Sequence, residues 1–99
     1  MENQHRKING YRELSQAEID LMNRIKSKGA ELLELHFELK TMLERTQSDK
    51  SNAAANDSQE YAEFERFMCA EPLRWAAIGK TDIQTGIMAL VRAVAQPRD

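Results

Sequence analysis

Apolar side chains recur at intervals of three and four residues over positions 16–45, the spacing of one face of an α-helix. Ser15 and Glu18 stand at the start of this pattern in the S-x-x-E order of a capping box, in which each side chain covers a free backbone N–H. We therefore expect a first helix over about 16–28. Gly29 follows it as the expected C-terminal cap.

A second helix is expected over about 30–45, and its apolar positions continue those of the first. Together they form a seam in which gaps of three and four alternate, the pattern of a heptad repeat. The seam consists of Met22, Ile25, Gly29, Leu32, His36, Leu39 and Leu43. An interior glycine costs a helix only about 1 kcal/mol, so the pattern leaves open whether Gly29 bends the chain or only weakens one long helix.

The second half of the chain begins with a segment that has no periodic apolar pattern. Residues 46–58 are rich in Ser, Asn, Asp and small side chains, so we expect a linker there. A short helix should follow over 59–70, with Asp57 or Ser58 as its cap. A last helix is expected over 72–95, because proline is favoured at the first position of a helix.

These elements predict an all-α fold in which a short N-terminal helix is bent against an antiparallel helical hairpin. Apolar side chains occupy more than one stripe on the long helices, and a single hairpin cannot bury them all. Gly79 and Gly86 lie one heptad apart in the last helix and would let another helix approach closely. Because most soluble oligomers are symmetric assemblies of one chain, we expect a homo-oligomer.

The composition restricts the chain to one domain over residues 1–99 and argues against several classes of partner. The net charge is -2 and the acids concentrate in residues 29–71, so the dense basic stripe typical of proteins that bind DNA or RNA polymers is missing. No run of about 18 apolar residues offers a membrane span. The single Cys69 excludes an internal disulfide and suits a reducing cytoplasm, and we expect it to be buried.

The sequence contains no arrangement that predicts catalysis or metal binding. His5 and His36 are the only histidines, and no acid pair stands near either at metal-ligand spacing. The tripeptide at 79–81, Gly-Lys-Thr, resembles the end of a phosphate-binding loop, but Arg74 occupies the place of the upstream glycine and the tripeptide lies within a predicted helix. We therefore predict a protein that is not an enzyme and uses no cofactor.

The strongest candidate binding residue precedes the first helix. Tyr11 is either a hydrophobic staple beside the helix start or a platform on which a base stacks, a contact worth about 1–3 kcal/mol. In the second reading, four cations would contact phosphates: Lys7, Arg12, Lys26 and Lys28. Two further cations lie in the first half of the last helix and form either part of an amphipathic interface or a second nucleotide-contacting cluster with Trp75: Arg74 and Lys80.

Two long motifs resemble a known family. They are HRKI-x-GYREL-x-x-x-EIDLMNRIK, beginning at His5, and RWAAIGKTDIQTGIMALVRAVAQP, beginning at Arg74. Both are similar to the phage anti-CBASS proteins of the second type, cyclic-oligonucleotide sponges that share a helical hairpin domain with the Thoeris-countering sponges. The resemblance covers about residues 5–45 and 72–97.

The resemblance implies a homo-hexamer of bent helical hairpins that acts in the cytoplasm of the infected bacterial host. It implies tight binding, without cleavage, of cyclic dinucleotides of the cyclic GMP-AMP type, which blocks CBASS signalling. Cyclic trinucleotides would occupy separate pockets on a threefold axis. By position, Tyr11 resembles the base-stacking tyrosine and Lys26 the phosphate-contacting lysine, both at interfaces between protomers. Arg74 is similarly a candidate for the trinucleotide pocket.

Residues 46–71 depart from the family, since they are longer than its short hairpin turn. This longer segment would cap the assembly or change its number of protomers. The alternative function is a structural or protein-binding helical hairpin that has no nucleotide ligand and uses Tyr11 only as a staple.

Overall fold

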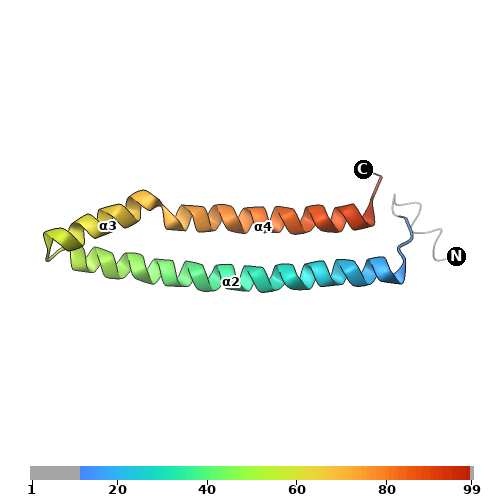
Figure 1. The fold of residues 1–99 in the computed structure, drawn as a ribbon, viewed down its shortest axis with the longest axis horizontal. Helices are drawn as coiled ribbons and strands as arrows, with labels where there is room; N and C mark the ends of the chain where they lie inside the picture. Colours follow the sequence, from blue (N-terminus) through green and yellow to red (C-terminus); the bar gives the residue numbers. More distant parts are fainter. Residues whose placement is uncertain (1–11, 99) are drawn as a thin grey trace. The chain divides into compact units, whose positions relative to one another are not determined.

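The computed structural model of the protein describes residues 12–98, which form three α-helices and contain no strand (Figure 1). The predicted all-α class is therefore confirmed. The helices are α2 (Gln16–Ala54), α3 (Ser58–Ala70) and α4 (Pro72–Ala95). The chain divides into two compact units, which we call unit 1 (Met1–Leu32 with Ile83–Asp99) and unit 2 (Leu33–Asp82).

In the described part of unit 1, the first turns of α2 pack against the last turns of α4 in antiparallel order. Arg12, just before α2, donates a hydrogen bond to the carbonyl oxygen of Val94 near the end of α4. Gly29, further along α2, lies against Ile87, which comes earlier in α4. This order is that of the predicted helical hairpin.

The start of α2 has the predicted capping box. The backbone N–H of Ser15 donates to Oε1 of Glu18 over 2.9 Å, and the N–H of Glu18 donates to Oγ of Ser15 over 3.2 Å. Two N–H groups that no helical carbonyl can reach are thereby satisfied by side chains only three residues apart. The helix boundary is thus determined locally.

The question left open at Gly29 is decided in favour of one long helix: α2 continues through this residue without interruption, so the expected C-terminal cap at Gly29 is wrong. Gly29 is buried, and a Cβ atom at this position would clash with Cδ1 of Ile87. The glycine therefore serves close packing against α4. By contrast, a Cβ on Gly79 or Gly86 would meet nothing within 4 Å in the described part of the chain, so the close approach expected at these two glycines stays a prediction about contacts between copies.

The predicted linker over 46–58 is also wrong for most of its length, since α2 continues to Ala54. Only residues 55–57 connect it to α3. An ion pair between Lys50 and Glu63, with 3.0 Å between Nζ and Oε2, joins the last turns of α2 to α3. Asp57 caps α3 as expected, accepting a hydrogen bond of 2.7 Å from the N–H of Gln59.

The junction between α3 and α4 also follows the sequence prediction. Glu71 adopts a left-handed conformation with φ 51° and ψ 50°, and its N–H donates to the carbonyl oxygen of Met68. The residue before a proline is disfavoured in the helical conformation. Pro72 then begins α4, at a position where its missing N–H costs no helical hydrogen bond.

The described chain has a very small buried core. Phe67 and Ala76 are its buried hydrophobic residues, both in unit 2. Cys69, expected to be buried, is exposed. Twelve large apolar side chains are exposed: Ile19, Leu21, Leu32, Leu35, Phe37, Leu39, Met42, Tyr61, Met68, Trp75, Met88 and Leu90.

Candidate ligand-binding site

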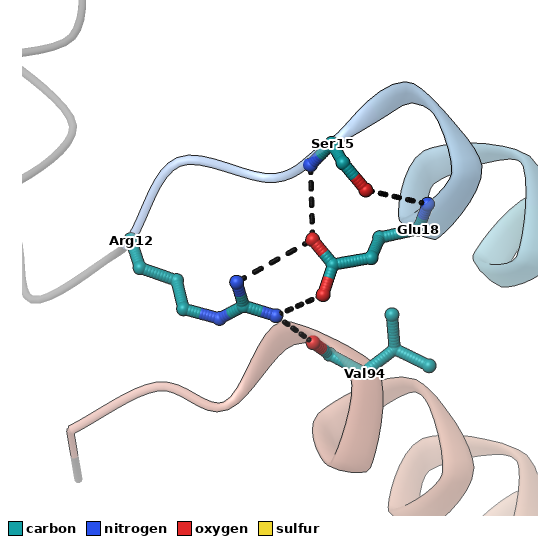
Figure 2. Close-up of polar contacts among 4 residues, drawn as sticks. All are labelled: Arg12, Ser15, Glu18 and Val94. Atoms are coloured by element: carbon teal, nitrogen blue, oxygen red, sulfur yellow. Dashed lines mark hydrogen bonds and ion pairs between the residues drawn. The ribbon is translucent and has the colours of Figure 1, made fainter.

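Arg12 donates three hydrogen bonds within the described part of unit 1 (Figure 2). Its Nη2 donates to Oε2 of Glu18 over 2.5 Å and to the carbonyl oxygen of Val94 over 2.7 Å, while Nη1 lies 3.4 Å from Oε1 of Glu18. The side chains of Arg12 and Glu18 are both about two-thirds covered. One guanidinium therefore joins the segment before α2, the cap of α2 and the end of α4.

The same contacts determine the charge state of Glu18. The guanidinium of Arg12, and then the backbone N–H of Ser15, lower the pKa of Glu18 from its ordinary 4.5 to about 2 by donating hydrogen bonds to the carboxylate. Near neutral pH the pair is therefore fully ionised, and a negative charge lies beside the guanidinium.

A largely apolar groove that is lined in part by two cations lies between α2 and α4 within unit 1. Its volume is about 360 Å³. The lining residues are Leu21, Arg24, Ile25, Lys28, Gly29, Leu32, Ile87 and Leu90. Arg24 was missed as a candidate by the sequence analysis. Arg24 could have been identified from its spacing of four residues from Lys28, which places the two cations on one face of the helix.

Lys26 does not line this groove. It lies two residues from Lys28, and because each residue of an α-helix turns by about 100°, the two side chains leave α2 in widely different directions. Lys26 is exposed. Lys28 lies 3.4 Å from Glu31 in a pair whose side chains are mostly exposed, and such pairs contribute about 0–1 kcal/mol to stability.

The other predicted residues of the dinucleotide site, Lys7 and Tyr11, lie outside the described residues. The structure places the remaining three residues, Arg12, Lys26 and Lys28, at different positions in unit 1. Arg12 lies against the end of α4, Lys28 lines the groove, and Lys26 lies on another face of α2. Lys26 comes eleven residues after Ser15, which is about 16 Å along the helix at its standard rise.

The predicted trinucleotide residues lie on α4 in unit 2. Arg74 is exposed, with its Nη1 3.6 Å from Oε2 of Glu71 and its guanidinium carbon 5.3 Å from the centre of the Trp75 ring. Lys80, six residues further along α4, is also exposed. The pairing with Glu71 is weak because both side chains remain more than half exposed.

No group of three or more His, Cys, Asp or Glu side chains that could hold a metal ion occurs over residues 12–98. Over the same residues, no helix has an apolar stretch long enough to cross a membrane.

The antiparallel pairing of α2 with α4 in unit 1 is that of a helical hairpin domain. The sequence model of the family described as Acb2/Tad1, hairpin domain, matches residues 3–95, and the chain belongs to this family. It is 58% identical over 105 aligned residues to Anti-CBASS protein 2 of Pseudomonas phage JBD67, an alignment that covers 98% of this chain and 97% of the relative. The family resemblance inferred from the two motifs is confirmed.

Proposed function

We propose that the protein blocks CBASS signalling by binding cyclic di- and trinucleotide messengers without cleaving them, in the cytoplasm of the infected bacterium. The observation that carries this proposal is the 58% identity to Anti-CBASS protein 2 over nearly the full length of both chains. The side chains support binding better than catalysis, because the described residues offer exposed cations and aromatic rings and no metal-binding group.

The dinucleotide site combines stacking with charge. Tyr11 stacks on a base, Lys26 contacts a phosphate, and Lys7 and Lys28 add positive charge. Arg12, the neighbour of Tyr11, is held at the start of α2, about 16 Å from Lys26 along the helix. We therefore place Tyr11 of one protomer beside Lys26 of another. A two-fold axis then presents two rings and two cations to the two bases and two phosphates of the ligand.

The trinucleotide site is separate and lies on a threefold axis. There Arg74, with Lys80 in support, contributes one cation per protomer to the three phosphates. The weak, exposed contact with Glu71 leaves Arg74 free to exchange that carboxylate for a phosphate.

Both sites require an assembly, which we propose to be a homo-hexamer. Twelve large apolar side chains of the described chain are exposed, and burying one such side chain contributes about 1.5–3 kcal/mol. Association of several copies is the direct way to remove this surface from water.

The proposal is tested by calorimetric titration of the full chain with cyclic GMP-AMP and with cyclic tri-AMP, followed by heat denaturation and chromatography of the released ligand. Sequestration predicts binding and recovery of intact cyclic nucleotide. Recovery of linear products would identify an enzyme. Absence of binding to both ligands would leave the structural or protein-binding hairpin as the function.

A further inference from the structure

We propose that Arg12 is a positioning residue, which clamps the start of α2 to the end of α4 and thereby determines the point from which Tyr11 reaches a ligand. This inference rests on the proposed function for the role of Tyr11. It differs from the sequence-based expectation that Arg12 contacts a phosphate.

The first contact of the clamp is with the cap of α2. Glu18 accepts from the Arg12 guanidinium through both carboxylate oxygens, and its Oε1 also accepts from the N–H of Ser15. The carboxylate that caps the helix therefore also holds the arginine. A planar guanidinium can make such a forked contact, whereas a lysine ammonium cannot.

The second contact is with the end of α4. Gln96 has a φ of 49° and its N–H closes the last turn on the carbonyl oxygen of Arg92. Beyond this residue the helix does not continue, so the carbonyl oxygen of Val94 has no helical partner. Nη2 of Arg12 donates to that oxygen over 2.7 Å (Figure 2). The clamp thus satisfies a carbonyl group that is 82 positions away in the sequence.

These contacts also explain why Arg12 is poorly suited to bind a phosphate directly. Nη2 is occupied by two acceptors and Nη1 faces the carboxylate. Nε is buried and has no partner within the described part of the chain. A phosphate approaching this guanidinium would meet the ionised Glu18, and the like charges would repel each other. Tyr11 is joined to Arg12 by a single peptide bond, so anchoring one restricts the other.

Two variants separate positioning from direct contact. Arg12→Lys keeps the positive charge but cannot fork between Glu18 and Val94. Glu18→Gln removes the ionic partner of Arg12 and keeps the capping box, because glutamine also serves at this position. The matched control is the arginine–glutamate pair within α3, altered as Arg66→Lys and Glu63→Gln.

Calorimetry with cyclic GMP-AMP gives the first readout. If Arg12 positions Tyr11, Arg12→Lys and Glu18→Gln should each weaken binding at least about tenfold. The double variant should bind no more weakly than the weaker of the two single variants, because both changes break the same contact. The α3 control should bind as the parent does. If Glu18→Gln leaves the affinity unchanged or increases it, Arg12 does not act through Glu18 and the proposal is wrong.

The second readout does not depend on a ligand. The ¹⁵N heteronuclear NOE of the Tyr11 amide should fall in both variants relative to the parent and stay unchanged in the control. If the parent binds no cyclic dinucleotide, the proposed function fails, and this NOE alone decides whether Arg12 positions Tyr11. An unchanged NOE in both variants would overturn the clamp.

Discussion

Ile87 of α4 packs directly against the backbone of Gly29 in α2. A Cβ atom at Gly29 would lie 2.7 Å from Cγ1 of Ile87 as well as touching its terminal methyl group. Cγ1 is held by the branched Cβ of isoleucine, whose χ1 angle has few alternatives. The two helices of unit 1 can therefore approach this closely only because residue 29 has no side chain.

We expect Gly29→Ala to destabilise the protein although alanine is the better helix former. Overpacking costs about 1–3 kcal/mol, against a gain of about 1 kcal/mol in helix propensity. Urea denaturation at one fixed protein concentration measures the change. The control is the same substitution in an Ile87→Ala background, where the clash is removed and Gly29→Ala should become neutral or stabilising. An equal loss in both backgrounds would contradict the packing explanation.

We expect Tyr11→Ala and Lys26→Ala each to weaken cyclic GMP-AMP binding at least about tenfold, since stacking on a ring contributes about 1–3 kcal/mol per base. Lys40→Ala, which alters another exposed lysine of α2, is the control and should bind as the parent does. Light scattering should show the same assembly in all three variants. Unchanged affinity in both Tyr11→Ala and Lys26→Ala would place the dinucleotide site elsewhere.

Cyclic tri-AMP binding should survive Tyr11→Ala and be lost in Arg74→Ala, with the opposite result for cyclic GMP-AMP. Glu71→Gln is the control, because it removes the present partner of Arg74 and should leave trinucleotide affinity equal or higher. Competition calorimetry provides the second check. If saturating cyclic GMP-AMP prevents trinucleotide binding, the two sites are not separate.

Light scattering at micromolar concentration should return about six times the 11.4 kDa mass of one chain. A charge placed on exposed apolar surface, as in Phe37→Glu or Leu35→Glu, should reduce this mass, because burying an unpaired charge at an interface is costly. Exposed Glu34→Gln is the control. A parent mass of about 11 kDa would rule out the hexamer.

The stability of the protein should fall as the pH drops from about 4.5 to about 2, partly because of Glu63. Hydrogen bonds from Arg66 and then Lys50 lower the pKa of Glu63 from 4.5 to about 2 in the folded protein. The unfolded chain therefore binds the proton first, so the contribution of Glu63 is present above pH 4.5 and is lost through this window. Melting temperatures between pH 2 and 6 should depend less on pH in Glu63→Gln. An identical pH dependence would show that these contacts do not form in solution.

Local signals in the sequence determined where the helices of this protein begin. Ser15 with Glu18, Asp57, and Glu71 with Pro72 each act over at most three residues, and the structure places helix boundaries at all of them. The two family motifs likewise identified the family, because they are long and contiguous.

Tertiary contacts decided what lies between those boundaries. Gly29 resembles a helix end in the sequence and is instead a contact point for Ile87, a residue that only the packing of α4 brings near. The polar stretch after residue 45 resembles a linker, yet it is helical to Ala54 and is joined to α3 through Lys50 and Glu63. Arg12 was interpreted as a cation for a phosphate, and only the fold brings its guanidinium to the carbonyl oxygen of Val94, 82 positions later in the sequence. Propensity and capping report on neighbouring residues, whereas these three features depend on contacts between residues distant in sequence.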